Sequence, residues 1–294
     1  MSIKVALATE RRLPDLTADD RILLAELRAR GVAAEAVVWD AEREWGESGA
    51  VVIRSCWDSH LRRDEFVEWA RRVERSGARL WNPARLVEWN TDKRYLRDLE
   101  SRGIAVVPTR WVREGDAVPP LAELLGDAGW EEAVVKPAIS AGAYETWRTS
   151  AVAARDDEAR FAALVRGGAG DVLVQPFVER VLRDGEWSLV FFAGDFSHAV
   201  RKRPAPGDFR VQEQFGGLTA PATPPPALVA DASRVVEEAA RATGIETHDV
   251  LYARVDGVEE EGRLVLMELE CVEPTLFFGY DVGAAGRMVD VLLG

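Results

Sequence analysis

The sequence predicts a mixed fold that is α/β in its first part and α+β in the remainder. Strand-like and helix-like segments alternate over residues 1–85 in the order β-α-β-β-α-β, which is typical of an open α/β sheet with a largely parallel core. Later in the chain, two pairs of strand-like segments are each joined by a short glycine-containing linker, which predicts antiparallel hairpins. With 294 residues, the chain is long enough for more than one packed unit.

Four apolar strands and two helices are expected in the first part of the chain. The strand-like segments are residues 3–8, 32–39, 50–54 and 79–81. A first helix is expected to begin at the capping box formed by Thr17 and Asp20 and to end at Gly31. A second helix is expected over residues 61–77. No G-x-G-x-x-G motif follows the first strand, so a dinucleotide site of that type is not expected.

The third of these strands ends at Arg54, at the edge where open α/β sheets bind ligands. A guanidinium group at this edge can hold a carboxylate or a phosphate with two parallel hydrogen bonds. Arg54 can instead pair with Asp58, four residues further on. The sequence leaves both readings open, and Arg54 is the candidate substrate-binding residue.

Two lysines stand out in the middle of the chain. Residues 90–102 predict a short helix with Lys93 in its first turn, where the helix dipole disfavours a cation, so Lys93 is expected to have an anionic partner elsewhere. Lys136 ends an apolar strand at Pro137, and small residues follow at 140–143. Small side chains let backbone N–H groups approach a phosphate and leave a loop free to act as a lid. A plain surface turn is the alternative.

The remaining elements follow from periodicity and from turn residues. Further strands are expected over residues 104–109 and 171–178, the latter interrupted by Pro176. A hairpin that ends in a basic cluster is expected over residues 185–203. Further helices are expected over residues 157–165, 227–243 and 283–293.

Three carboxylates are expected to converge on the last hairpin, which joins YARVD to RLVLMELE through the linker GVEEEG. Because a strand has a period of two, Glu268 and Glu270 project side by side, roughly 7 Å apart, on the face that Leu264 and Leu266 are also expected to share. Asp256 is expected beside them. Such carboxylates repel one another unless a cation lies among them, and hard oxygen ligands select Mg²⁺ or Mn²⁺. An exposed hairpin with solvated acids is the alternative.

Composition limits the classes of partner. The net charge is −13, from 50 acidic and 37 basic residues, and without a basic patch this excludes nucleic acid as the expected partner. No run approaches the ~18 apolar residues of a membrane span, so no membrane partner and a cytoplasmic location are expected. Cys56 and Cys271 indicate neither a disulfide framework nor a zinc site. The sequence leaves a monomer and a homodimer open.

The order of these features resembles the ATP-grasp superfamily. The shared set is a lysine on a helix, a lysine on a strand, a small-residue loop, an apolar strand broken near a proline, and a distal D…E-x-E hairpin. The motif GDFR, followed by a Gly-Gly pair, resembles the branch of glutathione synthetase and ribosomal-protein-glutamate ligase. The runs RSCWD, WNTDKRYL, KPAISAGAYET and MELECVEPTLFF are similar to O-ureido-serine cyclo-ligases, the ring-closing enzymes of D-cycloserine biosynthesis.

The resemblance implies an ATP-grasp fold with an N-terminal open α/β domain. Its specific motifs cover residues 90–294, and residues 1–85 fit more loosely. The implied parts are an N-terminal domain over 1–85, a connecting segment over 86–115, a small lobe over 116–178, and a C-terminal lobe with the Mg²⁺ site over 179–294.

The resemblance also implies a role for each residue that matches a motif of the superfamily. The residues implied to contact or cover the ATP phosphates are Lys93, Lys136, Ser140, Ala141 and Gly142. Those implied to hold the adenine edge and the ribose are Gln175, Phe177, Val178 and Glu186. Those implied to face the transferred phosphoryl group or the acyl phosphate are Lys202, Arg210 and Arg254. The implied Mg²⁺ ligands are Asp256, Glu268 and Glu270, the last of which stands where many relatives have asparagine.

The activity implied is that of an ADP-forming ligase. A carboxylate of a small amino-acid-like substrate attacks the γ-phosphate of ATP, and an amine captures the acyl phosphate; in a cyclo-ligase the amine belongs to the same substrate. Three alternatives stay open at this point: a dipeptide or amino-acid ligase of the glutathione-synthetase type, a nucleotide-binding protein without ligase activity, and an α/β enzyme that does not use ATP.

Overall fold

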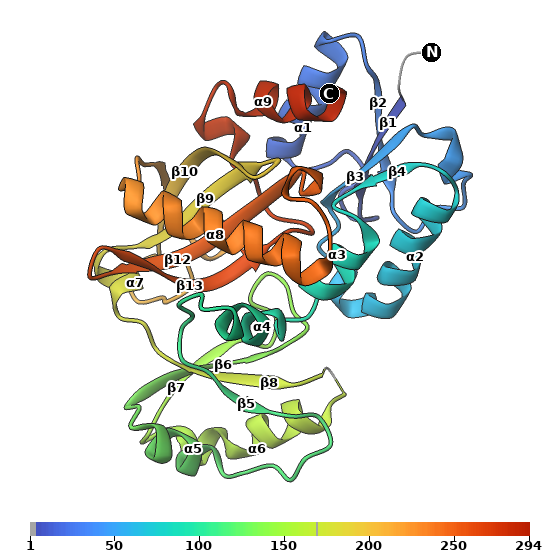
Figure 1. Ribbon diagram of the computed structural model, residues 1–294. Helices are drawn as coiled ribbons and strands as arrows, with labels where there is room; N and C mark the ends of the chain where they lie inside the picture. The colour runs from blue at the N-terminus through green and yellow to red at the C-terminus, as the bar shows by residue number, and fades with distance from the viewer. Residues whose placement is uncertain (1–3, 169) are drawn as a thin grey trace.

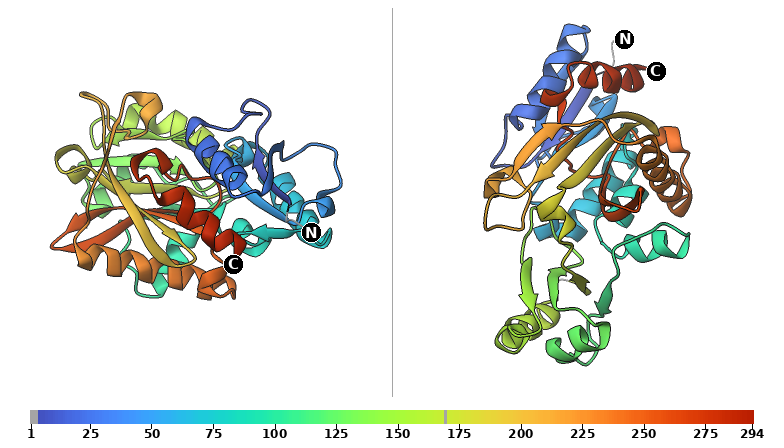
Figure 2. Two further views of the ribbon diagram at one scale, coloured as in Figure 1. Left: turned by 90° about the horizontal axis from the view of Figure 1, so that it is seen from above. Right: turned by 90° about the vertical axis from the view of Figure 1, so that its left-hand side faces the viewer.

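The computed structural model describes residues 4–168 and 170–294, which form three β-sheets with helices packed on them (Figure 1). The small sheet lies at one end of the molecule, and the two larger units lie side by side at the other end, as the side view also shows (Figure 2). This arrangement agrees with the predicted combination of α/β and α+β parts. None of the described helices is long and apolar enough to cross a bilayer.

The N-terminal sheet has the strand order β2-β1-β3-β4, and all its pairings are parallel, as predicted. Its strands are β1 (Lys4–Thr9), β2 (Ala33–Val38), β3 (Ala50–Ser55) and β4 (Arg79–Trp81). Its helices are α1 (Ala18–Ala29), α2 (Arg63–Arg75) and α3 (Ala84–Asn90), with short 3-10 turns at Trp45–Glu47 and Ser59–Arg62. Ile3, the first residue of the predicted strand over 3–8, lies outside the described residues.

The alternation of β1 explains why helices cover both faces of this sheet. Val5 and Leu7 lie in the core on the α1 side, whereas Ala6 and Ala8 lie in the core on the α2 side. Thr17 caps α1 as predicted, since its hydroxyl accepts a hydrogen bond from the backbone N–H of Asp20 at 3.1 Å.

The small sheet has the order β5-β8-β6-β7 and is antiparallel throughout. Its strands are β5 (Arg110–Val112), β6 (Glu132–Pro137), β7 (Trp147–Ser150) and β8 (Val172–Pro176). Helices α5 (Leu121–Ala128) and α6 (Ala154–Arg166) cover one face and share a separate core with it. Residues 104–109, predicted as a strand, make only a single bridge from Val106 to Leu266.

The central sheet has the order β11-β10-β9-β12-β13 and is also antiparallel. Its strands are β9 (Glu186–Phe192), β10 (Asp195–Arg203), β11 (Leu218–Pro221), β12 (Tyr252–Glu260) and β13 (Arg263–Glu270). The helices of this part are α4 (Tyr95–Ser101), α7 (Arg180–Arg183), α8 (Pro226–Thr243) and α9 (Ala284–Leu293). Short 3-10 turns occur at Glu213–Phe215, Thr247–Asp249 and Phe278–Tyr280.

The predicted carboxylate hairpin is formed by β12 and β13, and β13 contains a β-bulge. Asp256 pairs with Glu268, and the next residue, Gly257, pairs with Leu266, so Met267 is the extra residue. The bulge shifts the alternation of side chains along β13 by one position.

This shift corrects one prediction. Leu264 and Leu266 lie with Leu269 in the core beneath α8, and Glu268 and Glu270 belong to the opposite face. The expectation that both leucines share a face with Glu268 was therefore wrong, because it assumed an uninterrupted strand. The expectation that Glu268 and Glu270 lie on the same side as Asp256 is confirmed by the register.

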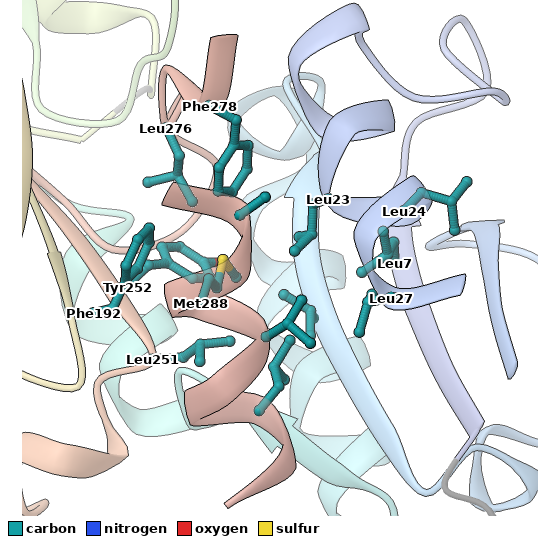
Figure 3. Close-up of a cluster of buried hydrophobic side chains, with 14 of the residues drawn as sticks. Leu7, Leu23, Leu24, Leu27, Phe192, Leu251, Tyr252, Leu276, Phe278 and Met288 are labelled. Carbon is teal, nitrogen blue, oxygen red and sulfur yellow. The ribbon is translucent and has the colours of Figure 1, made fainter. Parts of the chain in front are cut away.

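The N-terminal sheet and the central sheet share one hydrophobic core (Figure 3). Leu23 and Leu27 of α1 lie on one side of this core, and Tyr252 and Phe192 of the central sheet lie on the other. Met288 of α9 lies between them, so the last helix of the chain packs beside the first (Figure 3).

Candidate active site

A cluster of charged and polar side chains lies on the face of the central sheet that α8 leaves open. Alternate residues of β9 and β12, such as Leu189 and Val255, pack into the core beneath α8, so their neighbours in sequence face the other way. The polar side chains on this open face are Glu186, Ser188, Lys202, Arg254, Asp256, Glu268 and Glu270.

Asp256 is buried at the centre of this cluster, and the chain itself satisfies its carboxylate. Arg254 donates from Nε and Nη2 at 2.8–3.1 Å, Ser188 Oγ donates at 2.6 Å, and Lys202 Nζ lies 3.3 Å away. Burial alone would raise the pKa of Asp256, but Arg254 and Lys202 outweigh burial and lower this pKa to about 2. Asp256 is therefore ionised, and the neighbouring Arg254 and Lys202 compensate its charge.

Glu268 and Glu270 lie at the edge of the cluster and keep part of their surface accessible, with 31% and 29% of their side chains exposed. Lys93 Nζ lies 3.1 Å from Glu268, and Arg254 Nη2 donates to Glu270. Burial raises the pKa of Glu270 to about 7, although Arg254 acts in the opposite direction. The two carboxylates differ because Lys93 and Lys136 lower the pKa of Glu268 against the effect of burial.

Lys93 lies in the turn between α3 and α4, so its predicted place in the first turn of one helix over 90–102 was wrong. The physical reason is Asp92, whose carboxylate accepts from the backbone N–H of Arg94 at 3.0 Å and so breaks the helix. The predicted anionic partner is present, since Lys93 Nζ pairs with Glu268 and also donates to the carbonyl oxygen of Ser140 at 2.8 Å.

Lys136 extends from β6 towards the same carboxylates. Among the described residues, no carboxylate oxygen lies within 4.0 Å of its ammonium group, although Glu268 and Glu186 are close enough to raise its pKa. Burial is the largest effect and lowers the pKa of Lys136. A half-buried ammonium group without an anionic partner is placed to receive one from a ligand.

The predicted small-residue loop, 140–143, borders Lys93 through Ser140 and contacts the C-terminal part of the chain through Gly142. Gln214 Nε2 lies 3.3 Å from the carbonyl oxygen of Gly142. Gly142 and Ala143 both adopt left-handed φ angles, 58° and 62°. The loop therefore turns sharply next to Lys93, and Ala141 is one of the residues of this turn.

The predicted adenine hinge lies where the chain passes from the small sheet to the central sheet. Gln175 Nε2 donates to Thr109 Oγ1 at 2.9 Å, and the backbone N–H of Phe177 donates to the carbonyl oxygen of Glu132. Val178 follows and is half-buried against a small apolar cluster that contains Val181 and Val211. The Phe177 ring meets the edge of the Phe209 ring at 6.3 Å, so the loop over 205–217 lies against the hinge.

Glu186 and Arg210, two further predicted site residues, lie in different places. Glu186 accepts from Lys202 at 2.6 Å, so both belong to the buried cluster. Arg210 instead pairs with Asp208 at 2.7 Å and lies over the Phe215 ring. Among the described residues, no hydrogen bond or ion pair joins Arg210 to the cluster.

Arg54 is not placed to bind a substrate, and this prediction is corrected. Its side chain is buried, with Nε donating to Asp20 at 2.8 Å and Nη2 donating to the carbonyl oxygen of Pro274 at 2.6 Å. Its guanidinium group also stacks on the Tyr252 ring. The alternative pairing with Asp58 is not found either, since Asp58 accepts from the indole N–H of Trp39. Arg54 braces the N-terminal sheet against the segment after β13.

The donor chemistry of the cluster fits a hard divalent cation, but the side chains are not arranged as a ready metal centre. Within the described ranges, no three His, Cys, Asp or Glu side chains form a group that could hold a metal ion as they stand. Cations of the chain, Arg254, Lys202 and Lys93, lie among the carboxylates, and the assignment of Asp256, Glu268 and Glu270 as Mg²⁺ ligands stays a prediction. Arg254 donates to Oε1 of Glu270, and Lys93 lies 3.1 Å from Oε1 of Glu268.

Sequence reasoning missed two residues that support the cluster. Ser188 donates to Asp256 from the neighbouring strand, and its alternation with Glu186 was the available signal. Asn90 bridges the end of β13, since it donates to the carbonyl oxygen of Leu269 and accepts from the N–H of Cys271. No local sequence pattern predicts the contacts of Asn90, because its partners are about 180 residues away in the sequence.

Comparison with known proteins gives consistent relatives. A family model described as the N-terminal domain of D-cycloserine synthetase DcsG matches residues 5–82. The cycloserine biosynthesis protein DcsG of Streptomyces lavendulae is 36% identical over 201 residues, which cover 67% of each protein. The crystal structure of D-cycloserine synthetase DcsG superposes with a TM-score of 0.87 at 29% identity, covering 98% of both chains.

More distant structures share the fold. The D-alanine–D-alanine ligase of Bacillus anthracis, in complex with ATP, has a TM-score of 0.69 at 13% identity and covers 99% of this chain and 96% of its own. The ATP-grasp ligase PsnB, in complex with a minimal precursor, has a TM-score of 0.66 at 18% identity and covers 100% of this chain and 99% of its own.

Proposed function

This chain belongs to the ATP-grasp ligases, in the group of the cycloserine biosynthesis protein DcsG, and on this premise we propose that it activates the carboxylate of a small amino-acid-like molecule with ATP and joins it to an amine of the same molecule. The product is then a cyclic amide, with ADP and phosphate released. Proteins of this group are ATP-dependent ligases, and ring closure is the step that we propose for this chain.

One observation carries this proposal: the ammonium group of Lys136 lies near Glu268 and Lys93, and no carboxylate of the described residues is within 4.0 Å of it. The lysines come from the small sheet and from the turn before α4, and the carboxylates come from the central sheet. Cations on one side and carboxylates on the other are what a metal-bound polyphosphate requires. The nucleotide phosphates are therefore proposed to lie between the two sheets.

The residues of the chain would contribute in the following way. Lys136 and Lys93 bind the phosphates, and the loop over 140–143 covers them and excludes water, which would otherwise hydrolyse the acyl phosphate. Arg254, released from Glu270, stabilises negative charge on the transferred phosphoryl group, with Lys202 behind it. Asp256, Glu268 and Glu270 would hold the divalent cation, which when bound neutralises phosphate charge.

No protein nucleophile is required, and the two cysteines agree with this. Cys56 and Cys271 are both buried, and burial raises the pKa of both thiols. The carboxylate oxygen of the substrate attacks the γ-phosphorus, ADP leaves, and the amine then displaces phosphate from the acyl carbon.

The test is ADP release by the purified protein with Mg²⁺, ATP and a panel of amino acids that carry a second nitrogen nucleophile. We expect ADP to appear only with one or a few members of the panel, and mass spectrometry of the product to show the loss of one water from the substrate. ATP binding without ADP release on any amino acid would favour a nucleotide-binding protein. A linear dipeptide product would favour a ligase of the glutathione-synthetase type.

A further inference from the structure

Side chains from a distant part of the chain satisfy the outer edge of β13 near its end. β13 is the last strand of the central sheet, so the backbone groups on its outer edge need partners from other segments. Residues 105 and 107 supply backbone partners for Leu266. Further along the strand, Asn90 Nδ2 donates to the carbonyl oxygen of Leu269 at 2.9 Å, and Tyr95 Oη accepts from the N–H of Leu269 at 3.0 Å.

The amide of Asn90 holds both peptide groups that flank Glu270. The carbonyl oxygen of Leu269 belongs to the peptide group before Glu270, and the N–H of Cys271 belongs to the peptide group after it. Asn90 donates to the first and accepts from the second at 2.7 Å. Because peptide groups are planar, fixing these two planes fixes the direction in which the Glu270 side chain leaves the strand. Asn90 is buried, so its loss would leave two backbone groups without partners away from water.

The same segment carries Lys93, three residues beyond Asn90. The backbone N–H of Lys93 donates to the carbonyl oxygen of Ala138 at 2.9 Å, which attaches the segment to the end of β6. Its ammonium group lies 3.1 Å from Glu268. The distance between the carboxylates of β13 and the cations of the proposed phosphate site therefore depends on how this segment is joined to β13.

We propose that Asn90 is a positioning residue of the proposed reaction: it directs Glu270 so that a divalent cation can lie between Glu270 and Glu268 while Lys93 binds the phosphates. The inference rests on the proposed function and extends it to a residue that touches neither the metal nor the nucleotide. Mg²⁺ demands near-ideal octahedral geometry with ligands at about 2.1 Å, so a carboxylate displaced by roughly 0.5 Å binds it poorly. Asn90 carries no charge and acts only through the backbone of β13.

The test measures metal binding itself. Binding of Mn²⁺, a paramagnetic substitute for Mg²⁺, is followed in the presence of ADP by the loss of the electron paramagnetic resonance signal of free Mn²⁺. Asn90→Leu has nearly the same shape but can neither donate nor accept, and we expect it to raise the Kd for Mn²⁺ by about 10-fold or more. The Kd for ADP in EDTA should change by less than about 2-fold, because the backbone of Lys93 remains attached to Ala138 and Lys136 belongs to β6. A purely structural role would lower stability and leave the Mn²⁺ affinity of the folded protein unchanged.

A milder variant keeps the test decisive if Asn90→Leu does not fold. Tyr95→Phe removes the acceptor for the N–H of Leu269 and leaves the contacts of Asn90 in place, so we expect a rise of about 2- to 5-fold in the Kd for Mn²⁺. Met288→Ala is the control, because Met288 lies in the core between the N-terminal and central sheets and its loss should lower stability without weakening Mn²⁺ binding. All variants are compared at a temperature at which each is folded.

The outcomes separate the inference from the proposed function. Wild-type Mn²⁺ affinity in a folded Asn90→Leu variant overturns the positioning role. Wild-type affinity in Tyr95→Phe, where Asn90→Leu does not fold, overturns it as well, and so does an equal loss in Met288→Ala. A wild type that binds ADP but takes up no Mn²⁺ beside it would instead contradict the proposed function.

Discussion

At the scale of single residues, the active-site cluster is electrically balanced before any ligand arrives. Its cations are Lys93, Lys136, Lys202 and Arg254, and its carboxylates are Glu186, Asp256, Glu268 and Glu270. A nucleotide with its divalent cations adds charges of both signs, so the ion pairs can exchange partners without leaving a buried charge uncompensated. In the proposed function, Lys93 and Arg254 are the groups that change partner when the nucleotide binds.

The first prediction concerns Asp256→Asn, which should abolish ADP formation and also destabilise the metal-free protein. Its partners, Arg254 and Lys202, would remain buried with one carboxylate fewer, which costs about 3 kcal/mol. Urea denaturation in EDTA measures this. Glu268→Gln is the comparison and should lose less stability, because Glu268 is partly exposed and Lys93 keeps its contacts with Ser140. An Asp256→Asn variant as stable as the wild type would mean that mutual repulsion dominates.

The second prediction concerns Lys136→Ala, which should raise the KM for ATP by about 10- to 100-fold, the effect of losing a charge-assisted contact to phosphate. The melting temperature without nucleotide should hold or rise, since the substitution removes an ammonium group that burial disfavours and that no carboxylate of the described residues approaches within 4.0 Å. Unchanged ATP affinity in calorimetry would place the nucleotide elsewhere.

At the scale of elements, the segment after β13 is held against the end of β3 by several hydrogen bonds. Arg54 donates to the carbonyl oxygen of Pro274, and the Tyr252 hydroxyl lies 2.7 Å from the carbonyl oxygens of both Ile53 and Val272. These contacts join two parts of the chain that are about 200 residues apart. They explain why a guanidinium group is buried at this edge of the sheet.

The third prediction follows from this brace. Arg54→Lys should lower the free energy of unfolding by about 3 kcal/mol, because lysine keeps the charge but cannot reach both Asp20 and the Pro274 carbonyl. Denaturant titration measures the loss. The KM values for ATP and for the amino acid should rise together, because both sites depend on the joined segment. A rise in the amino-acid KM alone, in a fully stable variant, would restore Arg54 as a substrate ligand.

The fourth prediction concerns the bulge of the carboxylate hairpin. A Cβ atom at Gly257 would lie 2.5 Å from the carbonyl oxygen of Val265, so the two strands approach too closely there for any side chain. Gly257→Ala should therefore destabilise the protein by about 1–3 kcal/mol and reduce activity, because it shifts Asp256 relative to Glu268. Gly262→Ala, in the turn of the same hairpin, serves as a control for stability alone. Equal activity in both variants would contradict the prediction.

At the scale of the whole molecule, two of the three sheets form one structural unit. The core that contains Leu23, Met288 and Tyr252 joins the N-terminal sheet to the central sheet (Figure 3), whereas the small sheet has a core of its own around Phe161. The proposed nucleotide site lies between the unit and the small sheet. Opening and closing is therefore expected as a movement of the small sheet against a rigid remainder.

The fifth prediction is a difference in cooperativity. Met288→Ala should destabilise the N-terminal sheet and the central sheet together by about 2–5 kcal/mol, since both contribute to the core around this side chain. Hydrogen exchange followed by mass spectrometry should show faster exchange in β1 and β9, with β6 and β8 unchanged. Faster exchange confined to α9 would mean that the last helix detaches alone.

The sequence by itself determined the class of the fold, the carboxylate hairpin and the family. These depend on local signals: the period of the strands, the caps of the helices, and the order in which Lys93, Lys136 and the acids of β12 and β13 follow one another. These signals can be recognised without knowledge of the tertiary contacts. They are sufficient to pair Asp256 with Glu268 across a hairpin.

Only the tertiary structure decided how these residues are used. It buried Arg54 against Asp20, placed the bulge at Met267, and joined the indole of Trp57 to the backbone of Glu273. None of these can be read locally, because each depends on how closely two distant backbones approach or on which buried polar atom finds a partner. Long-range packing sets those partners, and the chemistry of the site follows from them.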